Sequence, residues 1–268
     1  MTEPAATRHS AALAGPVSGF SRRLFDGAEL VAHNDVIDAL STAITRFGTL
    51  YEWARSATQP FVLRGRAPVY VARVPGSDAT DLVVRHAWHG GLFAPLTRDL
   101  FTRPTRAPIE LCVSHALKAH NIPTPELMAY ALYAASPGVV RFDVASRYIP
   151  ASYDFAVVLA GTSPIIARQE AFAAIELLLR SLAEHGFTHP DLNVKNVLLS
   201  EVNGQAVAWV LDVDVVQQDV QRLVIRTMEA NVSRLVRSMV KSRRQFGVQI
   251  SDKEIREFRV RMLSTVQP

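Results

Sequence analysis

Residues 187–199 read FTHPDLNVKNVLL, and this short stretch decides how the rest of the chain is interpreted. It places a His, an Asp, a Lys and two Asn directly before a run of apolar residues. Polar residues of this kind often lie at turns because they hydrogen-bond to nearby backbone. The segments NVLLS and AVAWVLDVDVV predict two strands, and EVNGQ between them carries the Asn-Gly signal of a hairpin turn. The polar stretch therefore precedes a predicted β-hairpin.

The hairpin brings distant polar side chains together. Asn196 begins the first strand and LDVD ends the second, so Asn196 and Asp212 are expected to be neighbours, with Asp191 close by. Side chains alternate along a strand, which predicts that Asp212 and Asp214 point to the same side. A simple turn role is enough to explain Asn203. It does not explain the order and spacing of Asp191, Asn196 and Asp212 around one hairpin.

These side chains form an all-oxygen donor set. Carboxylate and amide oxygens suit Mg²⁺, which acts together with substrate phosphates. Asn196, Asp212 and Asp214 are therefore the candidate metal ligands. Asp191 is left to orient a hydroxyl group and accept its proton.

The first half of the chain is predicted to be rich in strands. Residues 35–57 show helical periodicity interrupted near Gly48, and the PGSD turn signal separates strands near 69–74 and 81–87. HGGLFAPLTRDLF predicts a loop that leads into a short helix. APIELCVSHALKAHN predicts a helix with Pro108 in its first turn and Cys112 in the core. VVRFDVASRYIP predicts a further strand.

The second half is predicted to be mainly helical. SPIIARQEAFAAIELLLRSLAEHG indicates a buried helix with Ser163 as its N-cap, Pro164 in its first turn and Gly186 as its stop. The hairpin follows, and from about residue 217 onward the chain is helical and basic.

Composition limits the class of protein. The 268 residues suit one large domain or two small lobes, with 49% hydrophobic and 20% charged residues. A net charge of +4 and a pI near 9.4 favour an acidic partner such as nucleic acid, anionic lipid or a phosphorylated substrate. One cysteine permits no internal disulfide, and no apolar run approaches a membrane span. The N-terminus lacks the pattern of a secretory signal, so a cytoplasmic protein is expected.

The motifs resemble those of a known family. HPDLNVKN followed by LDVD is similar to the H-x-D-x-x-x-x-N catalytic loop and D-F-G metal turn of protein-kinase-like phosphotransferases. VVRHAWHGGLFAPLTRDLF resembles the R-H-x-x-R-G-G-L segment of 3-deoxy-D-manno-octulosonic acid (Kdo) kinases, in the lipopolysaccharide kinase family. Their loop reads H-x-D-L-N-x-x-N and their metal turn D-F-D. NVSRLVRSMVK at 231–241 also resembles their C-terminal helix, so the resemblance spans roughly residues 60–245.

The resemblance implies an α+β, protein-kinase-like bilobal fold. It implies a β-rich N-lobe at 21–148 and a helical C-lobe at 149–268. The N-terminal residues are rich in Ala, Ser, Pro and Gly, and this composition predicts a disordered tail at 1–20. ATP and Mg²⁺ are the implied cofactors, with Asp191 as the base, Asn196 and Asp212 on the metal and His189 supporting the loop. The implied nucleotide-binding residues are Arg85 in place of the kinase lysine, its partner Glu110, Gly65 of the phosphate-covering turn RGRAPVY, and the backbone near Tyr148.

The implied reaction is phosphorylation of the Kdo sugar of the lipopolysaccharide inner core on a Kdo-lipid A precursor. It would take place at the cytoplasmic face of the inner membrane, and no nucleic-acid partner is expected. Two alternatives are a related phosphotransferase with another sugar, small-molecule or protein acceptor, and a pseudokinase that serves as a binding module. Retention of Asp191, Asn196 and Asp212 argues against the pseudokinase, whereas the loss of glycines around Gly65 favours it.

Residues 222–244 carry seven cations against Glu229. An apolar stripe accompanies them, formed by Met228, Val232, Leu235, Val236 and Met239. One interpretation is a helix that faces the core and carries a solvated basic surface. The other is that the basic face, including Arg234, Arg237 and Lys241, contacts anionic lipid.

Overall fold

The computed structural model describes residues 17–57, 61–63, 68–76, 80–89, 99–163, 165–246 and 248–264. Gly65, Pro164, the tip of the PGSD turn, the short helix expected after the Gly pair and the first sixteen residues of the expected tail lie outside these ranges. Within the described ranges, no helix combines the length and apolarity needed to cross a membrane. The chain divides into two compact units, 1–115 with 126–148, and 116–125 with 149–268.

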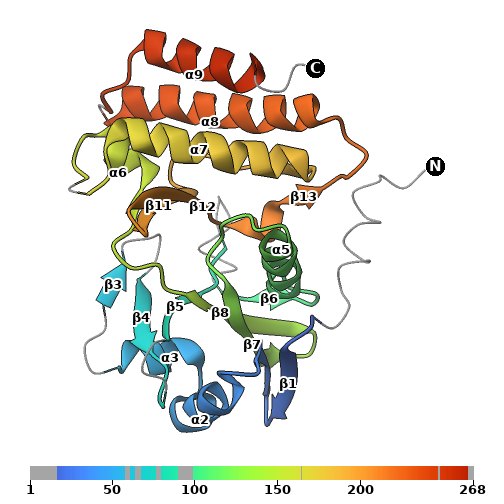
Figure 1. Ribbon diagram of the computed structural model, residues 1–268. Coiled ribbons are helices and arrows are strands. Elements are labelled where there is room, and N and C mark those ends of the chain that lie inside the picture. The colour runs from blue at the N-terminus through green and yellow to red at the C-terminus, as the bar shows by residue number, and fades with distance from the viewer. Residues whose placement is uncertain are drawn as a thin grey trace. The chain divides into compact units, whose positions relative to one another are not determined.

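The first unit is built on an antiparallel sheet in the order β1-β2-β7-β8-β5-β4-β3, with β6 paired to β8 (Figure 1). The strands are β1 (Phe20–Phe25), β2 (Ala28–His33), β3 (Phe61–Leu63), β4 (Val69–Arg73), β5 (Asp81–His86), β6 (Phe101–Thr102), β7 (Leu127–Ser136) and β8 (Val139–Arg147). The helices are α2 (Ile37–Phe47), α3 (Leu50–Arg55) and α5 (Ala107–Ala119), whose last turn belongs to the second unit.

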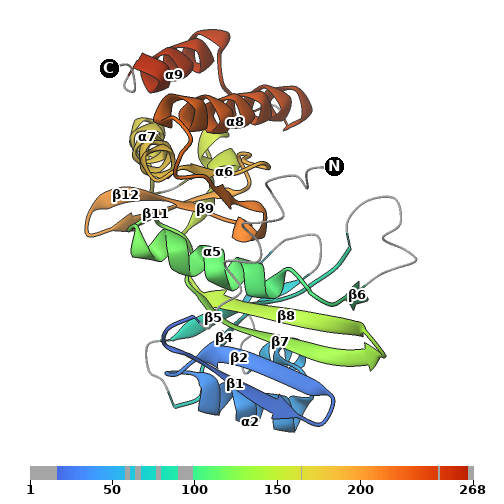
Figure 2. The same cartoon turned by 90° about the vertical axis from the view of Figure 1, so that its right-hand side faces the viewer.

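Helices cover both faces of this sheet. Figure 2 shows α2 on one side and α5 on the other. Because side chains alternate along a strand, Ala129 and Ala131 of β7 join the core with α2 and α3, whereas Tyr130 and Leu132 join the core with α5. This burial on both faces explains why β7 reads as a nearly continuous apolar run.

Most element predictions for the first unit are confirmed. The helix at 35–57 is interrupted at Gly48, which has a left-handed backbone and ends α2 before α3 starts. The strands on both sides of PGSD are present as β4 and β5, and Cys112 is buried on α5. The sequence interpretation does not identify β1, β2 and β7 individually.

The second unit is mainly helical. It contains β9 (Tyr153–Asp154), α6 (Phe155–Leu159), α7 (Arg168–Glu184), β10 (Phe187–Thr188), β11 (Val197–Val202), β12 (Gln205–Val210), the 3₁₀ turn η1 (Val213–Val215), β13 (Gln217–Gln218), α8 (Val224–Phe246) and α9 (Asp252–Ser264). Helices α7, α8 and α9 lie side by side (Figure 1), and β12-β11-β9 and β10-β13 form two small sheets. The α+β class is thus confirmed.

The apolar stripe of α8 faces this core as expected. Met228, Val232, Leu235 and Met239 are fully buried, and Phe258 of α9 is buried with them in the same unit. The predicted hairpin is also present, because Asn203 and Gly204 both adopt the left-handed backbone that a two-residue turn requires.

One helix boundary was wrong. Helix α7 begins at Arg168, not after Ser163. The hydroxyl of Ser163 accepts a hydrogen bond from the Ile166 N–H at 3.2 Å, which closes a local turn, and Glu170 accepts from the Ala167 N–H at 3.1 Å at the true helix start. The predicted stop is confirmed: Gly186 has φ +72° and lies against the Asp219 carbonyl, where a side chain would collide.

Candidate active site

His189 is the centre of the polar loop. It is fully buried, its Nε2 lies 2.9 Å from the Leu211 carbonyl, and its Nδ1 lies 3.2 Å from the Asp191 N–H. A carbonyl only accepts and an N–H only donates, so the ring is neutral with its proton on Nε2. Burial lowers the pKa of His189, against the opposing effects of the Leu211 bond and nearby carboxylates. His189 therefore ties Asp191 to the end of the hairpin, which supports the structural role expected for it.

The backbone of Asp191 is held by two amide side chains. Asn193 and Asn196 each donate from Nδ2 to the Asp191 carbonyl at 2.9 Å. Asn193 Oδ1 also accepts from the Lys195 N–H at 2.9 Å, so this residue braces the loop. Asp191 itself is exposed, and among the described residues its carboxylate makes no hydrogen bond or ion pair. The loop thus presents a fixed but unengaged carboxylate.

Asn196 lies beside the end of the second hairpin strand, as the sequence predicts. Its carbonyl accepts from the Leu211 N–H at 2.9 Å, one residue before Asp212. The Asn196 side chain is buried, and because its Nδ2 points to the Asp191 carbonyl, its amide oxygen points elsewhere. That oxygen remains suited to a cation.

The alternation argument for Asp212 and Asp214 was wrong. Strand β12 ends at Val210, Asp212 has a left-handed backbone with φ 51° and ψ 51°, and Asp214 lies in the 3₁₀ turn η1. The two side chains are therefore not placed by a strand pleat. A left-handed Asp costs roughly 1 kcal/mol or more, and such outliers concentrate at functional sites.

The carboxylates nevertheless gather around one point. Asp212, Asp191 and Asp214 all act electrostatically on the His189 ring. Asn196, Asp212 and Asp214 supply hard oxygen donors, which fit Mg²⁺. No group of three His, Cys, Asp or Glu side chains in the described part of the chain is arranged as a metal site. Asn196, Asp212 and Asp214 alone would therefore not complete the coordination of Mg²⁺. Substrate phosphates normally supply further oxygen ligands to this ion.

Helix α8 anchors the whole loop from one face. Asn231 Oδ1 accepts from the His189 N–H at 3.0 Å, and its Nδ2 donates to the Phe187 carbonyl at 2.9 Å. Arg234 Nε donates to the Pro190 carbonyl at 2.8 Å, and Ser238 Oγ accepts from the Val194 N–H at 3.0 Å. The sequence interpretation missed this anchor. Its signal was Asn231, a polar residue within an otherwise apolar helical stripe.

The candidate nucleotide residues belong to the first unit. Arg85 of β5 makes an ion pair with Glu110 of α5, which is buried, so the predicted pair is formed. The Tyr148 N–H donates to the Asp81 carbonyl at 2.9 Å, and that bond would have to break before this N–H could bind adenine. Gly65 lies outside the described residues.

Comparison with known proteins identifies the family of this chain. The model of the lipopolysaccharide kinase (Kdo/WaaP) family matches residues 64–260. The chain belongs to this family. A 3-deoxy-D-manno-octulosonic acid kinase of Actinobacillus succinogenes is 25% identical over 78% of this chain and 86% of that protein. The enzyme of the same name from Mannheimia succiniciproducens is 23% identical over 76% of this chain and 84% of that protein.

A third relative of that name, from Haemophilus influenzae, is 25% identical over 70% of this chain and 78% of that protein. A solved structure titled WaaP in complex with acyl carrier protein aligns with a TM-score of 0.49 and 14% identity, over 81% of this chain and 83% of that chain. The family model and the relatives named as kinases confirm the family resemblance seen in the motifs, and with it the kinase class of enzyme.

Proposed function

We propose that this protein transfers the γ-phosphoryl group of ATP to a hydroxyl of the Kdo sugar in a Kdo-lipid A precursor of the lipopolysaccharide inner core. The observation that carries the proposal is the exposed Asp191 carboxylate on a loop whose backbone is fixed by His189, Asn193 and Asn196. Membership of the family, with relatives named Kdo kinases, supports the choice of acceptor.

Asp191 orients the acceptor hydroxyl and takes its proton as the phosphoryl group arrives. Asn196, Asp212 and Asp214 are the residues that would hold Mg²⁺. When bound, this ion neutralises charge on the phosphate oxygens. The guanidinium of Arg85, held by Glu110, offers a planar fork of donors to nucleotide phosphate, and the Gly65 turn and the backbone near Tyr148 complete the proposed nucleotide site.

Turnover of Mg²⁺-ATP with a Kdo-lipid A acceptor tests this proposal. We expect phosphate from γ-labelled ATP to appear on the Kdo sugar, detected by mass spectrometry of the lipid product. A matched lipid A precursor without Kdo is the control acceptor and should remain unlabelled. Transfer to another sugar, a small molecule or a protein instead would support the related-phosphotransferase alternative. Absence of both turnover and nucleotide binding would support the pseudokinase.

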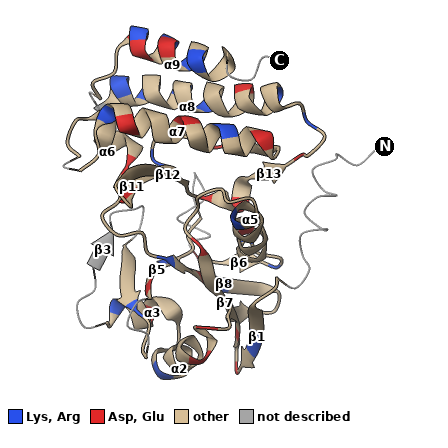
Figure 3. Cartoon of the chain, viewed as in Figure 1, with Lys and Arg blue, Asp and Glu red and all other residues tan. Residues whose placement is uncertain are grey.

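A lipid-linked acceptor requires that the protein reach a membrane surface, and α8 carries a basic face that could contact such a surface. Arg226, Arg237, Lys241 and Arg244 are exposed, and their spacings are close to whole helical turns, so they share one face. Figure 3 shows the cations along α8 in blue. Arg234 is not part of this exposed ridge, because its guanidinium binds the Pro190 and Ala230 carbonyls. We propose that the ridge contacts anionic lipid at the cytoplasmic face of the inner membrane.

Reversing Arg237, Lys241 and Arg244 to Glu is expected to weaken binding to vesicles of anionic phospholipid by roughly a hundredfold or more. The reason is that each cation near such a surface contributes about 1 kcal/mol to the free energy of membrane binding. Vesicle sedimentation measures the effect. The matched control reverses Lys253, Arg256 and Arg259, which are exposed on α9 and change the net charge equally. Equal loss in both triple variants would show a net-charge effect, and unchanged binding in the first would refute the α8 ridge.

A further inference from the structure

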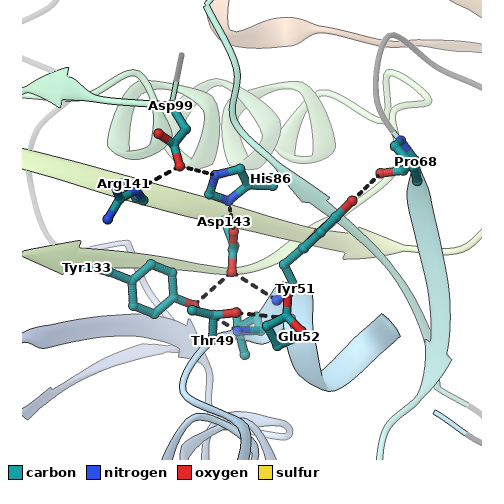
Figure 4. A network of polar contacts seen from close by, with 10 residues as sticks. Thr49, Tyr51, Glu52, Pro68, His86, Asp99, Tyr133, Arg141 and Asp143 are labelled. Carbon is teal, nitrogen blue, oxygen red and sulfur yellow. Dashed lines mark hydrogen bonds and ion pairs between the residues drawn. The ribbon is translucent and has the colours of Figure 1, made fainter. Parts of the chain in front are cut away.

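A cluster of charges around one buried carboxylate lies within the first unit, apart from the residues proposed to touch substrate (Figure 4). Its centre is Asp143 of β8, which has no exposed surface. One carboxylate oxygen accepts from the Tyr51 N–H and the Tyr133 hydroxyl, both at 2.9 Å, and the other lies 2.6 Å from His86 Nδ1. A fully buried carboxylate is costly unless it is paired and hydrogen-bonded, so these contacts offset the cost of burying Asp143.

His86 bridges two carboxylates. Its Nδ1 faces Asp143, and its Nε2 lies 3.2 Å from Asp99 Oδ2, which also accepts from Arg141 Nε at 2.7 Å. Ionised carboxylates only accept hydrogen bonds, so both ring nitrogens must donate, and the ring carries a positive charge. His86 and Arg141 then balance Asp99 and Asp143. A neutral ring would leave one nitrogen lone pair facing a carboxylate oxygen.

The other groups around the ring agree with this protonation state. Burial lowers the pKa of His86, but the hydrogen bonds and charges of Asp143 and Asp99 outweigh it and raise the pKa above its ordinary value. Tyr51 of α3, whose ring lies 5.6 Å from that of His86, and Tyr133 of β7 both have pKa values raised, chiefly by burial. Both phenols therefore stay neutral, and neither supplies a competing charge.

The cluster also fixes the start of α3. The first three N–H groups of this helix are satisfied by side chains: Leu50 donates to the Tyr133 hydroxyl at 2.8 Å, Tyr51 to Asp143, and Glu52 to Thr49 Oγ1 at 3.0 Å. Asp143 thus joins α3 and β7 to its own strand β8. Protonated His86 also joins β5 to Asp143, because His86 lies directly opposite Asp143 in the β5–β8 ladder.

His86 is the immediate neighbour of Arg85. Successive side chains on a strand point to opposite faces, so Arg85 reaches Glu110 on α5 while His86 reaches the α3 side. We propose that His86 is a permanently protonated positioning residue, which locks β5 to β8 and thereby holds the Arg85 guanidinium in place for nucleotide phosphates. The link to phosphates rests on the proposed function. The protonation does not.

The protonation is tested first, without activity. In protein labelled with ¹⁵N-histidine, we expect the His86 ring to keep both nitrogens protonated at about pH 7.5. Loss of one signal in the His86→Gln variant assigns the resonance. A neutral His86 ring at that pH would overturn the proposal.

Positioning is tested by nucleotide affinity. We expect His86→Gln to raise the Kd for Mg²⁺-ATP about tenfold with kcat at saturating ATP changed less than about twofold, because the reacting groups are untouched. His115→Gln, the same substitution at an exposed site of the same unit, should change neither. If His86→Gln fails to fold, Asp99→Asn, which leaves the Asp143 pair intact, should still raise Kd by about twofold to threefold.

The outcomes separate the two proposals. An ATP Kd unchanged in both His86→Gln and Asp99→Asn would overturn the positioning role. A wild-type protein that binds no ATP would overturn the proposed function and the positioning role together, while the ¹⁵N spectrum would still decide the protonation of His86.

Discussion

Replacing Asp191 by Ala is expected to reduce kcat by about 10²- to 10⁴-fold, the usual contribution of a positioned general base. The loop should survive this change, because the Asp191 carbonyl, and not its carboxylate, accepts the bonds from Asn193 and Asn196. The carboxylate has no partner among the described residues, so its removal leaves no buried group unsatisfied. Nucleotide affinity should therefore change little. Initial rates at saturating ATP and acceptor, together with calorimetric titration of Mg²⁺-ATP, measure both quantities.

Glu201→Ala is the matched control for this loss of charge. Glu201 is an exposed carboxylate near the far end of β11, and it belongs to neither the proposed metal site nor the nucleotide site. Its kcat should equal that of the wild type. If Asp191→Ala keeps full turnover, Asp191 is not the base. If it loses ATP binding in parallel with turnover, its role lies in the nucleotide complex rather than in proton transfer.

The geometry of the hairpin site could be predicted because it is local. The Asn-Gly turn sets the register of β11 against β12, and that register places Asn196 opposite Leu211, next to Asp212. The prediction failed where the strand stopped. Asp212 leaves the β region for a left-handed backbone, and neither alternation nor residue type reports such a change in advance.

Contacts between distant segments could not be predicted in the same way. Asn231 and Ser238 lie more than forty residues from the loop positions that they bind. A helical pattern shows which face of α8 is buried, but it does not show what lies against that face. The cluster around Asp143 could not be predicted for the same reason. In the sequence, a carboxylate between Phe142 and Val144 looks like an exposed strand position, and only the packing of α3 shows that it is buried.

Replacing Asn231 by Ala is expected to lower the free energy of unfolding by about 2–6 kcal/mol. Asn231 has no exposed surface, and its amide serves both the His189 N–H and the Phe187 carbonyl. Each buried backbone group left without a partner costs about 1–3 kcal/mol, against a total stability of about 5–15 kcal/mol. The loop that carries Asp191 should also lose its fixed position, so kcat should fall. Urea unfolding and initial rates measure the two effects.

In Asn231→Asp the carboxylate can still accept from the His189 N–H but cannot donate to the Phe187 carbonyl, and the substitution buries an unpaired charge. Its loss of stability should therefore be at least as large as that of Asn231→Ala. Ser233→Ala, on the same helix but away from the loop contacts, is the control and should stay within about 0.5 kcal/mol of wild type. If Asn231→Ala is as stable as Ser233→Ala, α8 does not anchor the loop. If its stability falls while kcat at saturating substrates is unchanged, the anchor serves folding alone, and the position of Asp191 is set by His189 and the two loop amides.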